Sequence, residues 1–129
     1  MKRHIVLIGL PGAGKSTVGK MVAERLHTAS AVIAPGGGWA AQPGALDSAK
    51  PRGYIVYLKA RAEVAAGRAE PSGTRPVLMG DDPLARMKDL FTQRDPFYAK
   101  ADATVLTEAK SAENVAAEVV KLAQMSAGW

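Results

Sequence analysis

The sequence GLPGAGKST at residues 9–17 directly follows the apolar stretch HIVLI at residues 4–8. It matches the phosphate-loop pattern G-x-x-x-x-G-K-[ST] at each fixed position. Glycines let successive backbone N–H groups converge on a phosphate, and a helix predicted from about Lys15 to Leu26 would direct its positive dipole end at the same anion. Lys15 can reach the β- and γ-phosphates, and the Ser16 hydroxyl can bind Mg²⁺. The alternative is a Gly-rich turn with a chance lysine, but the flanking strand and helix favour a nucleoside triphosphate site.

Length and composition predict one compact domain over residues 1–129. The chain has 129 residues, of which 47% are hydrophobic and 22% charged, enough for a core and typical of a globular domain. It has no cysteine, which excludes a disulfide framework and a thiolate zinc site. The first apolar stretch is too short for a signal peptide, and none is long enough to span a membrane. We therefore expect a cytoplasmic protein without a membrane partner.

The net charge of +5 does not predict nucleic-acid binding. The basic residues are scattered, and aromatic residues make up only 5%, so no stacking platform for bases is evident. Arginines and lysines that hold phosphates and a carboxylate account for the excess equally well.

Apolar and amphipathic stretches alternate along the chain, which is typical of a parallel α/β fold. Four apolar stretches are predicted as strands: 4–9, 31–34, 54–58 and 103–107. Helices are predicted over 15–26, over 62–69, from Pro83 onward, and after Ser111 as N-cap. Residues 47–52 are predicted as a polar turn, and 70–83 as a mobile loop rich in Pro and Gly. The pattern predicts a three-layer α/β domain with a parallel sheet of about four strands.

Four features occur in the order found in shikimate kinases, which the chain resembles from Ile5 to about Leu122. They are the phosphate loop, the triple glycine 36–38, the sequence RPVL at 75–78, and Arg94 followed by Pro96 and Tyr98. The resemblance implies a P-loop NTPase topology and a kinase that uses ATP and Mg²⁺. It also implies transfer of the γ-phosphoryl group to the 3-hydroxyl of shikimate.

The resemblance also implies roles for individual residues. Lys15 and Arg75 would be catalytic, with Arg75 reaching over the transferring group from the lid at 70–83. Ser16 would bind the metal, Arg94 would clamp the shikimate carboxylate, and Gly37 and Gly38 would present N–H groups to its hydroxyls. The residues implied to bind ATP are Gly12, Ala13, Gly14, Lys15, Ser16, Thr17, Arg68, Arg75, Lys110 and Ser111.

Each of these features outside the phosphate loop has a simpler structural interpretation. A triple glycine after a strand is often only a flexible loop, and Arg75 in a Pro/Gly-rich segment is often a solvated charge. Arg94 on a helix could form a surface salt bridge, although its planar fork also suits a carboxylate. We interpret Tyr98 as a packing residue.

The chain departs from the family pattern after the first helix. Roughly forty residues are absent when the sequence is set against that pattern, including an Asp-x-Asp motif and one carboxylate-clamping arginine. The lost aspartate resembles a base for the attacking hydroxyl. Asp47 could replace it, although loop acids are usually solvated, and His27 could also do so, although a helix-end histidine more often serves as a cap charge.

Three functions remain open from the sequence. The first is a shikimate kinase that is weak or inactive because its acceptor segment is missing. The second is a nucleotide-binding module or slow ATPase, and the third is a kinase for another acceptor such as a sugar acid. We expect a monomer, with pairing through the exposed strand at 31–34 as the alternative.

Overall fold

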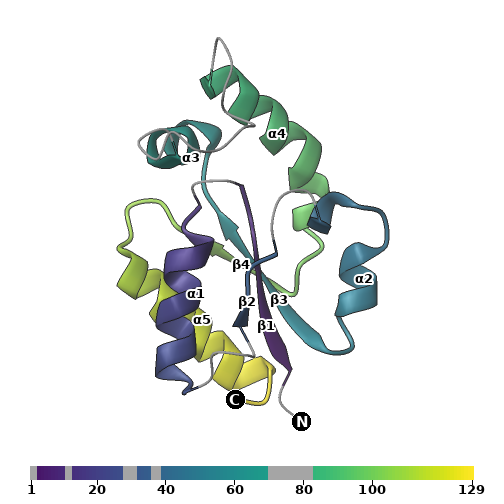
Figure 1. Ribbon diagram of the computed structural model, residues 1–129, viewed down its shortest axis with the longest axis vertical. Coiled ribbons are helices and arrows are strands. Elements are labelled where there is room, and N and C mark those ends of the chain that lie inside the picture. Colours follow the sequence, from purple (N-terminus) through teal and green to yellow (C-terminus); the bar gives the residue numbers. More distant parts are fainter. Residues whose placement is uncertain (1–2, 11–12, 28–31, 36–38, 70–82) are drawn as a thin grey trace.

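The protein forms one parallel four-stranded sheet covered by helices on both faces (Figure 1). The computed structural model describes residues 3–10, 13–27, 32–35, 39–69 and 83–129, and only the backbone of residues 66–69 and 83. The strands are β1 (His4–Ile8), β2 (Val32–Ile33), β3 (Gly53–Lys59) and β4 (Ala103–Leu106). Their order in the sheet is β2-β1-β3-β4, and each neighbouring pair is parallel. The predicted fold class and the four strands are confirmed.

The helices connect successive strands, as a parallel sheet requires. They are α1 (Lys15–Arg25), the 3-10 turn η1 (Trp39–Ala41), α2 (Ala45–Ala49), α3 (Ala62–Ala69), α4 (Pro83–Tyr98) and α5 (Ala112–Ser126). The prediction of a polar turn at 47–52 is wrong at its start, because residues 45–49 form α2. Only Leu46 of this five-residue helix is fully buried. With a single buried side chain, the sequence of α2 shows no helical repeat of apolar residues.

Alternate residues of the strands enter two separate cores, one on each face of the sheet. Ile5, Leu7 and Val56 pack against α1 and α5, where Val18 and Val119 are buried. Val6, Ile55 and Tyr57 face the other way and pack against residues of η1, α2, α3 and α4. The three layers predicted from the sequence follow from this alternation.

The predicted N-cap of the last helix is confirmed. The Ser111 hydroxyl oxygen accepts a hydrogen bond from the Asn114 backbone N–H at 3.1 Å, which satisfies one of the free donors at the start of α5. The sequence SAEN therefore sets where α5 begins.

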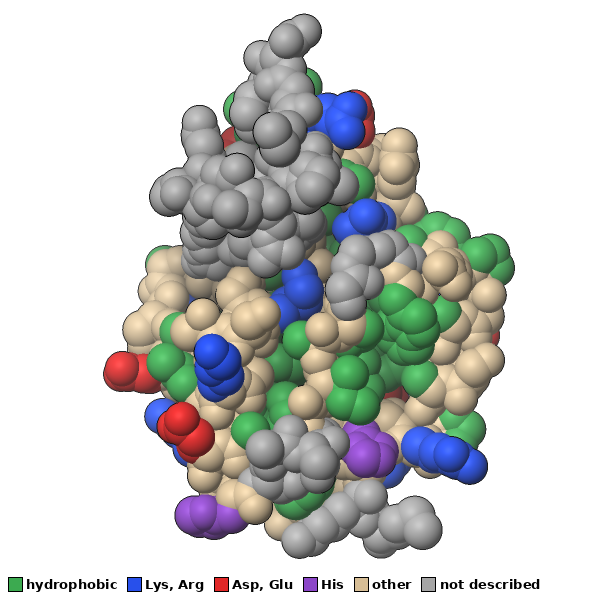
Figure 2. Space-filling model, in the orientation of Figure 1, with side chains coloured by type: hydrophobic (Ala, Val, Ile, Leu, Met, Phe, Trp, Pro, Cys, Tyr) green, Lys and Arg blue, Asp and Glu red, His purple; other side chains and the backbone are tan. Residues whose placement is uncertain are grey.

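Strand β2 lies at one edge of the sheet, as predicted for residues 32 and 33. Ile33 remains 43% exposed. Figure 2 shows apolar side chains gathered on the face in view, between the positions of β2 and α2 in Figure 1. No helix in the described ranges is both long and apolar enough to cross a membrane.

Candidate functional site

The phosphate loop begins at the carboxyl end of β1, where it passes close to β3. Gly9 has φ +152°, and a Cβ atom there would lie 2.5 Å from the Leu58 carbonyl oxygen. Only glycine fits this approach without a shift of the backbone. Gly14, with φ +92°, then forms the N-cap of α1, and its carbonyl accepts a hydrogen bond from the Val18 N–H at 2.9 Å. The two glycines therefore aim the amino end of α1 across the end of the sheet.

The Lys15 side chain lies over this loop. Its Nζ donates hydrogen bonds to the carbonyl oxygens of Gly9 and Leu10, both at 2.8 Å. Ser16 and Thr17 follow in the first turn of α1, are exposed, and share that turn with no acidic residue. A cation and the positive end of a helix dipole are thus combined at one point, which is the arrangement that binds phosphate groups.

A hollow of about 210 Å³ lies between the phosphate loop and the connection from β4 to α5. Lys110 lies in its wall, and its Nζ donates to both carboxylate oxygens of Glu118 at 3.0 Å. The neighbouring Ser111 is engaged as the N-cap of α5. The residues that line the hollow are Ala13, Gly14, Thr17, Val18, Thr107, Lys110, Ala112 and Val115. The structure therefore brings Lys110 to the same hollow as the described part of the phosphate loop.

Arg94 lies on α4 next to Asp95, which contacts two side chains at the end of β3. The Tyr57 hydroxyl donates a hydrogen bond to Asp95 Oδ1 at 2.9 Å, and Lys59 Nζ lies 3.6 Å from the same oxygen. Burial raises the pKa of the Tyr98 hydroxyl, and the positive charge of Arg94 offsets part of that rise. Tyr98 packs, as expected: it is 1% exposed and its ring centroid lies 5.0 Å from that of Tyr57.

His27 lies at the wrong end of α1 to act as a base at the phosphate loop. Helix α1 has 11 residues and begins at Lys15. At about 1.5 Å per residue, its far end is roughly 16 Å from the loop. His27 has φ 55° and its N–H donates to the Glu24 carbonyl at 3.3 Å, so it belongs to the end of the helix.

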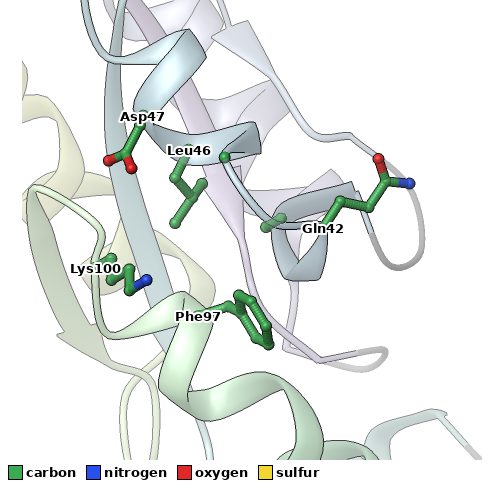
Figure 3. A pocket seen from close by; sticks show the side chains of 7 residues that line it. Gln42, Leu46, Asp47, Phe97 and Lys100 are labelled. Carbon is green, nitrogen blue, oxygen red and sulfur yellow. The ribbon is translucent and has the colours of Figure 1, made fainter.

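Asp47 also lies away from the phosphate loop. It is an exposed residue of α2 and lines a pocket of about 10 Å³ together with Leu46, Phe97 and Lys100 (Figure 3). Helix α2 ends at Ala49, whose carbonyl oxygen adjoins Gly53 at the amino end of β3. The phosphate loop follows the carboxyl end of the parallel strand β1, so Asp47 and the loop lie at opposite ends of the strands.

Several predicted site residues lie outside the described part of the chain. These are Gly12, Gly37, Gly38 and Arg75, together with most of the lid at 70–83. Arg68 belongs to α3, of which the backbone alone is described at that position. Among the described residues, no three His, Asp or Glu side chains come together as a metal site.

Comparisons with known proteins all identify the same family. A family model described as shikimate kinase matches residues 27–124. The shikimate kinase of Caldanaerobacter subterraneus is 31% identical over 162 positions, covering 92% of this chain and 95% of the relative. That of Symbiobacterium thermophilum is 29% identical over 167 positions, covering 94% and 96%.

Solved structures agree. The shikimate kinase from Acinetobacter baumannii, in complex with shikimate, is similar with a TM-score of 0.84 and 25% identity over 97% of this chain and 94% of that one. The shikimate kinase from Aquifex aeolicus gives a TM-score of 0.74 and 28% identity, covering 95% and 96%. The alignment with the Caldanaerobacter relative spans 162 positions against 129 residues here, so that relative has at least 33 residues without a counterpart in this chain.

Proposed function

Because the chain belongs to the shikimate kinase family of ATP-dependent kinases, we propose that it transfers the γ-phosphoryl group of ATP to the 3-hydroxyl of shikimate. The observation that carries the proposal is the position of Lys15. Its ammonium group lies 2.8 Å from two carbonyl oxygens of the phosphate loop, beside the amino end of α1. A triphosphate at this point would meet a cation and backbone N–H donors together.

For the nucleotide, the proposed binding site consists of the phosphate loop and the hollow beside it. We propose that the N–H groups of residues 12–17 hold the phosphates, that Lys15 contacts the β- and γ-phosphates, and that the Ser16 hydroxyl holds Mg²⁺. We propose that the base enters the hollow of about 210 Å³, in whose wall Lys110 lies, and that Ser111 and Arg68 also contribute to binding it. Bound Mg²⁺ supplies charge neutralisation at the phosphate oxygens.

On the acceptor side, we propose that Arg94 binds the shikimate carboxylate and that Gly37 and Gly38 donate N–H groups to its hydroxyls. A guanidinium presents two parallel N–H groups, which match a planar carboxylate. Arg75 would approach from the lid and neutralise charge that develops on the transferring group. The acceptor oxygen then forms a bond to the γ-phosphorus, the bond from that phosphorus to the bridging oxygen of ADP breaks, and the hydroxyl proton passes to water.

We propose that turnover is weak, because this chain lacks residues that its relatives have. Loss of a base need not abolish phosphoryl transfer, which depends mainly on positioning and electrostatics. Loss of a second carboxylate-binding arginine is more serious, because it leaves the acceptor poorly oriented. The partner is therefore a small molecule, and we propose a monomer that acts without nucleic acid or membrane.

The alternative is a nucleotide-binding module or slow ATPase without kinase activity. The missing residues, at least 33 relative to the Caldanaerobacter enzyme, favour it. Release of ADP that depends on added shikimate would support the kinase, whereas ADP release that is the same without shikimate would support the alternative.

The decisive experiment is calorimetric titration with shikimate in the presence of Mg²⁺ and a non-hydrolysable ATP analogue. Saturable binding that is lost in Arg94→Ala would support the proposed acceptor site. Arg52→Ala is the matched control, because Arg52 is exposed and precedes the amino end of β3. Binding of the analogue without any shikimate heat would overturn the kinase proposal.

A further inference from the structure

Two connections at the carboxyl end of the sheet are joined to each other by hydrogen bonds. One leads from β3 to α3, and the other leads from β4 to α5. The backbone N–H and the hydroxyl of Thr107 donate to the Lys59 carbonyl oxygen, at 3.0 and 3.2 Å. The backbone N–H and the side-chain Nε of Arg61 both donate to Glu108 Oε1, at 2.7 and 2.9 Å. The start of the β4–α5 connection is therefore bound to the residues that lead into α3.

The β4–α5 connection also forms a wall of the hollow beside the phosphate loop. Thr107 and Lys110 line this hollow, and Thr107 is only 2% exposed. In Figure 1 the connection, in yellow-green, passes beside the amino end of α1. Glu108 lies between the two lining residues in the chain, but its carboxylate reaches Arg61. Glu108 therefore holds wall residues in place without lining the hollow itself.

The backbone of this connection is strained between two anchors. Ala109 has φ 58°, a left-handed conformation that is unfavourable for a residue with a Cβ atom. Such a conformation persists only where the surrounding contacts impose it. On one side of Ala109, Glu108 is bonded to Arg61, and on the other, Lys110 Nζ donates to both carboxylate oxygens of Glu118 at 3.0 Å. Loss of an anchor would let the connection adopt other conformations, and a ligand would then have to order it on binding.

We infer that Glu108 is a positioning residue for the nucleotide base, because it holds the β4–α5 connection against the residues that lead into α3. With the wall ordered in advance, the base meets a formed hollow and its binding does not have to restrict the connection. The inference rests on the proposed function, since it requires that the base of ATP enters the hollow. It assigns Glu108 a role through its neighbours and no contact with the reacting atoms.

The first test is Glu108→Ala, measured by calorimetric titration with two ligands in the presence of Mg²⁺. One ligand is the non-hydrolysable ATP analogue, and the other is inorganic tripolyphosphate, which has the phosphate chain but no base. We expect the analogue to bind about five- to tenfold more weakly, the factor expected when about one residue must be ordered on binding. The affinity for tripolyphosphate should change less than about twofold, because it depends on the phosphate loop. Glu113→Ala is the matched control, because it removes the same charge from an exposed residue in the first turn of α5.

A second pair of variants separates the reach of the side chain from its charge. Glu108→Gln loses the charge but keeps the length of the side chain and an oxygen that accepts from Arg61. Glu108→Asp keeps the charge but is one methylene shorter. We expect Glu108→Asp to bind the analogue about fivefold more weakly than Glu108→Gln, because only the longer side chain holds the connection in place.

The outcomes separate this inference from the proposed function. Wild-type affinity for the analogue in Glu108→Ala would overturn the inference and leave the kinase proposal standing. Equal weakening of analogue and tripolyphosphate binding would indicate a general loss of structure and would also overturn it. If the unmodified protein binds the analogue no more tightly than tripolyphosphate, the inference fails together with the proposed site for the base. ADP release that does not depend on shikimate would overturn the kinase proposal alone. If Glu108→Ala does not fold, equal affinities of Glu108→Asp and Glu108→Gln would be the contradicting result.

Discussion

Val6 of β1 and Ile33 of β2 are direct partners in the parallel register, yet Val6 is 5% exposed and Ile33 is 43% exposed. Partners in a parallel pair project from the same face of a sheet. The difference therefore comes from position, because β1 has a strand on both sides and β2 lies at the edge.

This pair predicts opposite tolerance to substitution. Val6→Ala should lower the free energy of unfolding by about 2 kcal/mol, because it opens a cavity in a packed core. Ile33→Lys should change it by less than about 1 kcal/mol and should slow aggregation, because a lysine opposes edge-to-edge pairing. Urea unfolding and light scattering at matched protein concentrations would measure the two effects. Similar losses of stability in both variants would mean that Ile33 is buried in solution, for instance in a dimer.

Removal of the Lys15 ammonium should separate nucleotide binding from folding. Lys15→Ala should weaken binding of the ATP analogue by about ten- to a hundredfold, because a charged group then loses its hydrogen bonds to phosphate. The melting temperature should fall little, since these two hydrogen bonds of Lys15 join it only to its own loop. Lys20→Ala, an exposed residue on the same helix, is the control for titration calorimetry. An unchanged affinity in Lys15→Ala would remove the basis of the nucleotide site.

Gly9→Ala should destabilise the fold for a steric reason. The added Cβ would lie 2.5 Å from the Leu58 carbonyl oxygen, a distance that backbone atoms can relieve only by moving β1 and β3 apart. We expect a loss of about 2–4 kcal/mol in stability, typical of overpacking combined with an unfavourable backbone angle. Gly44→Ala is the control for the backbone angle alone, because Gly44 has φ +80° but no atom within 4 Å of the added carbon. In thermal unfolding, Gly9→Ala should have a much lower melting temperature than Gly44→Ala. The reverse order would contradict the steric argument.

The buried tyrosines predict alkaline instability. Burial raises the pKa of the Tyr57 hydroxyl, and the hydrogen bond to Asp95 and the charge of Asp95 raise it further; burial also raises the pKa of Tyr98. In the unfolded chain both hydroxyls have a pKa of about 10. The unfolded state therefore loses these protons first, and stability should decline as pH rises above about 10, with a slope approaching 1.4 kcal/mol per pH unit for each tyrosine.

Denaturant unfolding between pH 8 and pH 11.5 would measure this decline. The double variant Tyr57→Phe/Tyr98→Phe should be less stable at pH 8 but should show a shallower loss with pH. An equally steep loss in the double variant would assign the alkaline transition to other groups.

Local patterns sufficed for much of the fold. The phosphate loop, the Ser111 cap and the four apolar stretches each depend on residues close together in the chain, so the parallel α/β class and most element positions could be predicted. Helix α2 could not, because five residues with one buried side chain show no period. The partner of Tyr57 is Asp95, 38 positions away, and no local pattern indicates such a contact.

The sequence by itself determined the phosphate loop and its helix, because glycine conformations, a helix dipole and one lysine act over a few neighbouring residues. It also marked Lys110 and Arg94 through family resemblance. Only the tertiary structure decided that Lys110 lies in the hollow beside the loop, that Asp95, next to Arg94, accepts a hydrogen bond from Tyr57 of β3, and that His27 and Asp47 lie away from the phosphate loop. The physical reason is that the order and direction of strands determine which residues meet at one end of a sheet, and burial of both faces sets that order.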